Sequence, residues 1–94
     1  MSKKVLGELA ENGLIGLNCE VVNSSQRSLV GVQGRIIDET LKTLTVATQQ
    51  GEKKIQKDTV TLRVDFPTER AIIEGEDLLQ RPQERLRKLW RKLR

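Results

Sequence analysis

Apolar and polar residues alternate through most of the chain between residues 16 and 66. The alternation is most regular in TVTLRVDF (59–66), in which every second residue from Val60 to Phe66 is apolar. A period of two predicts a strand with one buried and one exposed face. Similar patterns predict further strands at residues 17–22, 30–39, 43–48, 53–56 and 70–75. The residues predicted to point inward are Leu17, Cys19, Val21, Val30, Val32, Gly34, Ile36, Leu44, Val46, Val60, Leu62, Val64 and Phe66.

The two ends of the chain have the 3.6-residue period of amphipathic helices instead. This period predicts one helix over residues 3–12, which Gly13 can end, and a second over residues 82–93, which begins at Pro82. The second helix carries its basic residues mostly opposite its apolar stripe. The apolar positions of the two helices are Val5, Leu6, Leu9 and Ala10 in the first and Leu86, Leu89, Trp90 and Leu93 in the second.

Short strands joined by tight turns, with no helices between them, indicate a mostly β protein. We expect a small, strongly bent antiparallel barrel of five or six strands, because closing a sheet hides its edges. A doubly wound α/β fold is excluded because its crossover helices are missing. A chain of 94 residues suffices for one modest core. The predicted organisation is a helical, partner-binding extension at 1–13, the barrel at 14–75 and a basic amphipathic helix at 76–94.

Two glycines stand three residues apart in the apolar run LVGVQGRII (29–37). A Gly-x-x-Gly loop can clamp a nucleic-acid backbone, as in KH domains, when it joins two helices. Here Val32 and Gln33 separate the glycines and both flanks alternate as strands, which favours a structural role. A residue without a Cβ lets a strand enter and bend, or lets another segment pack closely. We therefore assign structural roles to Gly31 and Gly34, and interpret Gly75 as the end of the last strand.

The composition excludes several kinds of site. The chain has no histidine and one cysteine, Cys19, so we expect neither an intramolecular disulfide nor an ordinary Cys/His zinc site. Asp38 and Glu39 end a predicted strand without obvious partners, so we interpret them as turn and loop residues. We expect no catalytic residue, metal site or bound cofactor in this chain. No signal peptide or membrane-spanning apolar run is recognisable, which indicates a cytoplasmic protein.

Four segments occur in an order that carries a family resemblance: LIGL, SLVGVQGRIIDETLKTLTV, KKIQKD and IIEGEDLLQRPQERLRKL. With these motifs the chain resembles the archaeal ribonuclease P protein component 1 family, which is related to a eukaryotic subunit of the same enzyme. The resemblance covers roughly residues 14–88 and is most specific over 28–44 and 75–85. The chain departs from the family at Gln56, where a proline often precedes the lysine that matches Lys57. The resemblance implies an Sm-like barrel fold.

The resemblance also implies a function, namely that of a subunit of the ribonucleoprotein that removes 5′ leaders from precursor tRNA. In that endoribonuclease the RNA carries the chemistry with bound Mg²⁺, and the proteins support RNA folding and substrate binding. The implied partners are the ribonuclease P RNA, precursor tRNA, a zinc-ribbon protein subunit and other proteins of the enzyme. We expect Val5, Leu6 and Leu9 to contact the zinc-ribbon subunit. A protein-interaction adaptor and a ribosome-associated RNA-binding barrel stay open as alternatives.

Positive charge is concentrated at the C-terminus. The whole chain carries +4, and residues 81–94 hold seven basic residues against Glu84, or +6, so residues 1–80 carry −2. The aromatic residues are Phe66 and Trp90, both on predicted apolar faces, so base stacking is a poor binding mechanism. We expect Lys and Arg to contact phosphates and 2′-hydroxyls instead. The predicted RNA-binding residues are Arg35, Lys53, Lys54, Lys57 and Arg63, of which the last four are expected on adjacent strands, and Arg81, Arg85, Arg87, Lys88 and Arg91.

Overall fold

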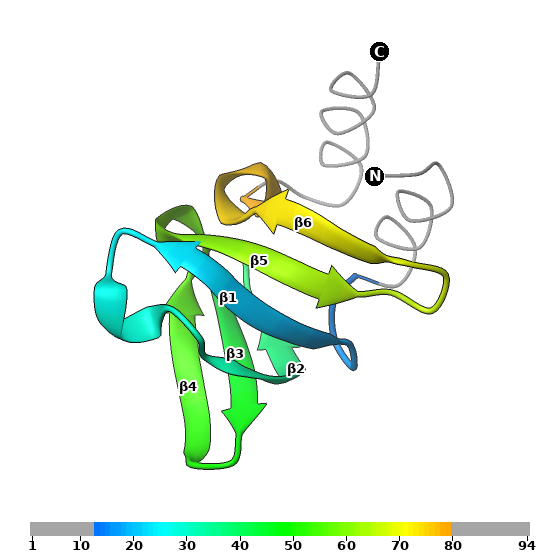
Figure 1. Ribbon diagram of the computed structural model, residues 1–94, viewed down its shortest axis with the longest axis horizontal. Coiled ribbons are helices and arrows are strands. Elements are labelled where there is room, and N and C mark those ends of the chain that lie inside the picture. Colours follow the sequence, from blue (N-terminus) through cyan, green and yellow to red (C-terminus); the bar gives the residue numbers. More distant parts are fainter. Residues whose placement is uncertain (1–12, 80–94) are drawn as a thin grey trace.

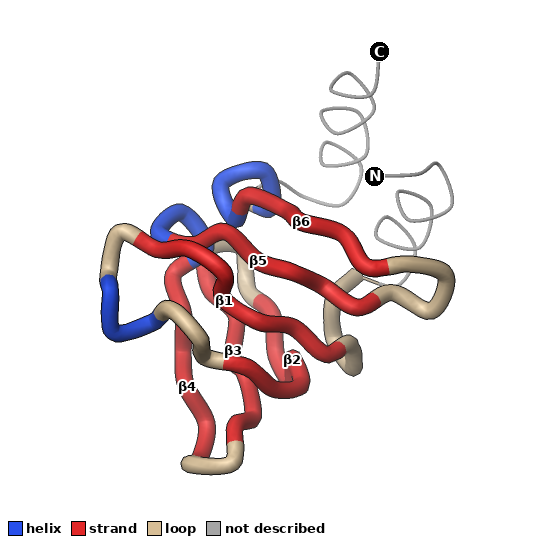
Figure 2. The backbone as a smooth tube through the Cα atoms, in the orientation of Figure 1, coloured by secondary structure: helices blue, strands red, loops and turns tan. Residues whose placement is uncertain are grey.

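The computed structural model describes residues 13–79, and the helices predicted over 3–12 and 82–93 lie outside this range. The described residues form six strands and three short 3-10 helices, as the ribbon in Figure 1 and the tube in Figure 2 show. The strands are β1 (Asn18–Ser24), β2 (Gln33–Glu39), β3 (Thr43–Thr48), β4 (Gly51–Gln56), β5 (Val60–Asp65) and β6 (Arg70–Glu74). The 3-10 helices are η1 (Arg27–Leu29), η2 (Lys57–Thr59) and η3 (Gly75–Leu78).

All six strands belong to one antiparallel sheet with the strand order β4-β3-β2-β1-β5-β6. Strands that follow each other in the chain pair with each other, except that η2 leads from β4 to β5, which pairs with β1. The sheet is strongly bent, so that β1 runs at a steep angle to β3 and β4 and crosses in front of β3, while β5 and β6 follow beside β1 (Figure 1). The prediction of a mostly β protein with a bent antiparallel sheet of five or six strands is therefore confirmed, with six strands present.

Two β-bulges contribute to the bend. The register of β1 against β5 shifts between Val21 and Asn23, and the register of β2 against β3 shifts between Ile36 and Asp38. A bulge places one extra residue in a strand and increases its local twist. The extra residues are Val22 and Ile37, and both are partly exposed. In the pairs Val21–Val22 and Ile36–Ile37, the first residue thus belongs to the core and the second to a bulge.

The inward faces of the six strands enclose a single hydrophobic core. The predicted alternation is confirmed most fully in β5, where Val60, Leu62 and Val64 are buried. The prediction is wrong for Val30, which is 47% exposed, because β2 begins only at Gln33 and the chain still turns through Gly31. The core residues are Leu14, Cys19, Val21, Ile36, Leu44, Val46, Ile55, Val60, Leu62, Val64, Phe66, Ala71, Ile73 and Leu78.

Gly34 lies in β2 at a point where β3 approaches closely. A Cβ at this position would lie 2.0 Å from the carbonyl oxygen of Ala47 and 3.1 Å from the side chain of Val46. Because the nearest atom belongs to the backbone, no side-chain rotation can relieve the overlap. The space beside Gly34 is filled by the neighbouring strand, and a larger residue would have to push the two strands apart.

The side chain of Lys57 is buried at the junction between β4 and β5. Its Nζ donates to Oε2 of Glu39 at 2.7 Å and to the carbonyl oxygens of Thr40 at 2.7 Å and Leu78 at 3.0 Å. A longer contact of 3.3 Å reaches the carbonyl oxygen of Leu41. These bonds connect η2 with the end of β2, with the β2–β3 loop and with η3. One ammonium group thus joins η2 to residues 39–41 and to η3, which are distant in the sequence.

The core continues past residue 75, the predicted end of the barrel. Leu78 in η3 is fully buried, and Asp77 is nearly so. Gly75 packs directly on η2, because a Cβ there would lie 1.8 Å from the carbonyl oxygen of Lys57. The predicted boundary is therefore wrong, since η3 is part of the barrel and not of a separate segment over 76–94.

We expect Gly34→Val to abolish the cooperative unfolding transition of the domain, because its side chain would overlap the backbone of β3. Gln33→Val is the matched control, since residue 33 is exposed on the same strand. We expect this control to change the free energy of unfolding by less than about 1 kcal/mol. Circular dichroism during thermal and urea unfolding measures both variants. A Gly34→Val protein of wild-type stability would contradict the structural role of Gly34.

Lys57→Met should lower the free energy of unfolding by about 3 to 5 kcal/mol, because it removes the cation of a buried ion pair. Adding Glu39→Leu should recover part of this loss, since the carboxylate that lost its cation is then gone. The control is Lys54→Met on the exposed face of β4, with an expected change below about 0.5 kcal/mol. Urea unfolding provides the measurement, and equal losses for Lys57→Met and Lys54→Met would refute the proposed importance of the junction.

Candidate nucleic-acid interface

The described part of the chain is slightly acidic. Residues 13–79 contain eight Lys and Arg residues against ten Asp and Glu residues, a net charge of −2, whereas the whole chain carries +4. Attraction of an RNA to the sheet must therefore come from local groups and not from the overall charge of this part. The position and the pairing of each cation decide whether it can contact a phosphate.

Arg63 belongs to a row of alternating charges across β1, β5 and β6. Its Nη1 donates to Oε1 of Glu20 at 3.0 Å and its Nε to Oδ1 of Asp65 at 3.3 Å. The same carboxylate oxygen of Asp65 lies 3.4 Å from Nε of Arg70. Ion pairs of this partly exposed kind add little to stability, but they compensate the charges that take part. The guanidinium of Arg63, a predicted RNA contact, is thus already paired with two carboxylates.

Lys57 does not line a surface in this fold, and its predicted contact with RNA is wrong. The side chain is only 1% exposed, and its Nζ donates to the carboxylate and carbonyl oxygens described above. Glu39 likewise differs from its interpretation as a loop residue, because it is the last residue of β2 and the ionic partner of Lys57. The two residues stand 18 positions apart. No local sequence pattern could have revealed that they pair.

Lys53 and Lys54 are neighbours on β4 whose side chains point to opposite faces of the sheet. Lys53 lies opposite Val46 and is partly buried, whereas Lys54 lies opposite Thr45 and is exposed. β4 is an edge strand, and β3, β2 and β1 separate it from β5, which carries Arg63. The prediction that these lysines lie on a strand adjacent to that of Arg63 is therefore wrong, and each lysine stays a candidate.

Arg35 is exposed on β2, between Asn18 of β1 and Ala47 of β3. Its guanidinium extends toward Gly16, where a Cβ would lie 3.7 Å from Nη2 of the arginine. Across residues 13–79 it takes part in no ion pair. An anion can therefore approach it, and its contact with RNA stays a prediction.

The remaining predicted site residues lie outside the described range of 13–79. They comprise half of the predicted RNA-binding residues and all of the predicted partner-binding residues. These residues are Arg81, Arg85, Arg87, Lys88 and Arg91 toward the C-terminus and Val5, Leu6 and Leu9 toward the N-terminus.

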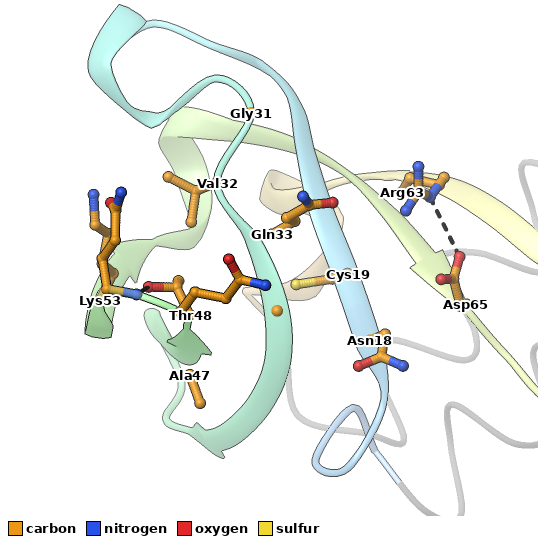
Figure 3. A pocket seen from close by; sticks show the side chains of 13 residues that line it. Asn18, Cys19, Gly31, Val32, Gln33, Ala47, Thr48, Lys53, Arg63 and Asp65 are labelled. Atoms are coloured by element: carbon orange, nitrogen blue, oxygen red, sulfur yellow. Dashed lines mark hydrogen bonds and ion pairs between the residues drawn. The ribbon is translucent and has the colours of Figure 1, made fainter.

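A hollow of about 500 Å³ opens where the start of β2 meets the turn between β3 and β4. Figure 3 shows Cys19 on β1 at one side of it, with Val32, Thr48 and Lys53 at the opposite side and Arg63 beyond β1. Sequence reasoning did not find this site, because its walls come from separate parts of the chain. The residues that line it are Asn18, Cys19, Gly31, Val32, Gln33, Gly34, Ala47, Thr48, Gln49, Gln50, Lys53, Arg63 and Asp65.

Cys19 is the cysteine that lines the hollow. Burial, with a smaller contribution from Asp65, raises the pKa of the Cys19 thiol from 9.0 to about 11. At neutral pH this sulfur is therefore a thiol and a weak nucleophile. Over residues 13–79, no three His, Cys, Asp or Glu side chains come together in a way that could hold a metal ion. None of the helices in the same range has the length and apolar character needed to cross a membrane.

Comparison with known proteins identifies a family that covers the whole described sheet. The model of the family "Ribonuclease P/MRP, subunit p29" matches residues 7–88. A ribonuclease P protein component 1 from Methanosphaera stadtmanae is 41% identical over 81 residues, which are 85% of this chain and 87% of that protein. The protein of the same name from Methanococcus maripaludis is 35% identical over 97 residues, 99% of this chain and 97% of that one.

A solved structure supports the same relationship at the level of the fold. It is described as a homologue of the human RNase P protein Rpp29, and it matches this chain with a TM-score of 0.56 at 33% sequence identity. The match covers 76% of this chain and 94% of the solved one. The resemblance stated from the motifs is therefore confirmed, and this chain belongs to the ribonuclease P/MRP subunit p29 family.

Proposed function

We propose that this chain is an RNA-binding protein subunit of ribonuclease P, the ribonucleoprotein that removes 5′ leaders from precursor tRNA. The observation that carries the proposal is the family match, which extends over residues 7–88 and so includes the complete bent sheet. Its relatives are named as protein components of ribonuclease P. The subunit would associate with the RNA of the enzyme and with its other proteins, and it would support RNA folding and binding of precursor tRNA.

The cleavage chemistry belongs, in this proposal, to the RNA and its bound Mg²⁺. The character of the described residues supports this division, because the Cys19 sulfur is a neutral thiol and no cluster of metal ligands occurs over 13–79. The chain would then act by positioning RNA and not by touching the reacting atoms. It would work in the cytoplasm, where precursor tRNA is processed in a cell without a nucleus.

The affinity for RNA would come mainly from the C-terminal residues. The described part carries −2 and residues 81–94 carry +6, so the attraction to a polyanion is concentrated in the tail. Arg81, Arg85, Arg87, Lys88 and Arg91 would contact phosphates there. Arg35, Lys53 and Lys54 would add contacts on the sheet, where they form no ion pair with other described residues.

The N-terminal apolar residues would serve a different partner. Val5, Leu6 and Leu9 share one face of the helix predicted over 3–12, and an apolar stripe of this kind is suited to packing against a protein. We assign this stripe to the contact with the zinc-ribbon subunit of the enzyme.

Reconstituted cleavage of precursor tRNA at limiting Mg²⁺ tests the proposed function. Adding the full chain to the RNA and the remaining proteins should raise the cleavage rate by about tenfold or more, since added cations replace part of the Mg²⁺ requirement. The Lys57→Met variant is a control for correct folding and should be less effective. A chain that assembles with the other proteins but leaves cleavage unchanged would favour a protein-interaction adaptor. Association with ribosomes in place of this RNA would favour the ribosomal alternative.

Removing residues 81–94 should weaken binding to the RNA of the enzyme and flatten its salt dependence. The slope of log K against log salt concentration should fall by about 0.7 to 0.9 for each phosphate contact that is lost. A full-length variant in which the seven basic residues of the tail become glutamine serves as the charge-only comparison. Filter binding over a range of KCl concentrations gives the slopes, and a slope that neither change alters would refute the role of the tail.

A further inference from the structure

The hollow beside the start of β2 is rich in groups that match the edges of nucleobases. Gln33, Gln49 and Gln50 line it and are exposed to solvent. Within residues 13–79, the side-chain amides of these three residues make no hydrogen bond. A glutamine amide offers a donor and an acceptor side by side, which is the arrangement that pairs with a base edge. Three such amides at one hollow form a hydrogen-bonding surface that has no partner in the fold itself.

The same hollow carries a local positive charge on an acidic domain. Lys53, Arg63 and Asp65 line it, and because Arg63 is paired with Asp65 and with Glu20, the positive charge is that of Lys53. Asp65 is engaged by Arg63 and also by Arg70. Lys53 takes part in no ion pair with another described residue, so its ammonium can meet an incoming phosphate.

The size of the hollow suits one nucleotide. Its volume of about 500 Å³ falls within the range of small-molecule sites, whereas an RNA duplex contacts an extended surface. The rim is open at Gly31, since a Cβ there would find nothing within 4 Å. No aromatic side chain lines the hollow, so a base would be held by its edge and not by stacking.

We propose that this hollow binds a single unpaired nucleotide of the RNA, with a phosphate at Lys53 and the base edge at the glutamine amides. Unstacked nucleotides in loops and bulges expose the base edges that such a site requires. The inference rests on the proposed function, because it takes an RNA as the ligand. It adds a point of sequence recognition to a surface whose other expected contacts are to phosphates alone.

Binding of the ribonuclease P RNA to three full-length variants tests the proposal. Lys53→Gln should weaken binding about fivefold and lower the salt slope by about 1. The double change Gln33→Leu and Gln50→Leu should weaken binding about tenfold with an unchanged slope, because it removes hydrogen bonds and no charge. The matched control is Lys42→Gln, which removes the same charge from an exposed loop at a position that does not line the hollow. We expect less than a twofold effect from this control.

Mapping of 2′-hydroxyl reactivity along the RNA provides the second measurement. One nucleotide should be protected by the wild-type chain and by Lys42→Gln, and should regain reactivity with the glutamine double variant. Wild-type affinity of both hollow variants, or an equal loss for Lys42→Gln and Lys53→Gln, would overturn the nucleotide site. If cleavage is still supported in that case, the proposed function stands without the site. Urea unfolding of each variant checks that the changes leave the fold intact.

Discussion

The buried ammonium of Lys57 fastens η2, the link between the two sides of the bent sheet, to the end of β2, to the β2–β3 loop and to η3. β4 is an edge strand and β5 pairs with β1, so the chain must pass from one side of the bent sheet to the other through η2. Gly75 allows η3 to lie against the same turn. A surface ion pair could not hold these segments so firmly, because water and salt would screen it.

This use of charge leaves the sheet with few cations for RNA. Lys57 is buried and paired with Glu39, and the charges of Arg63 and Arg70 are neutralised by nearby carboxylates. Phosphate contacts provide affinity and orientation, whereas contacts to base edges provide sequence specificity. Affinity and sequence specificity can therefore come from different parts of this chain. The basic residues of the tail would supply most of the attraction, and the hollow on the acidic domain would read one nucleotide.

The run LVGVQGRII shows how architecture and binding share the same residues. Gly31 adopts a positive φ of 90° with open space around it, whereas Gly34 is required because the backbone of β3 leaves no room for a Cβ. Both glycines also line the hollow, and Gln33 between them contributes an amide to it. The two glycines therefore serve the turn before β2 and the close approach of β3, and this part of the chain forms one wall of the candidate site.

The sequence by itself determined the strands, their inward faces and the location of the positive charge. Alternation is a local property of an extended backbone, so Val60, Leu62 and Val64 could be assigned to the core without knowledge of any partner strand. The order of the motifs was enough to identify the family. The limits of the strands were less certain, as Val30 shows, because a turn with a positive φ can interrupt an apolar run.

Only the tertiary structure decided which charged residues are available and where a ligand can bind. Lys57 has the sequence environment of a surface lysine, yet the pairing of β2 with β3 and of β3 with β4 brings it to Glu39, 18 positions away. The bend of the sheet brings β1, β2, β5 and the β3–β4 turn around one hollow, although none of these segments has a nucleotide-binding pattern of its own. The physical reason is that burial and pairing depend on which distant segments meet. Local periodicity determines the direction of a side chain but not what lies opposite it.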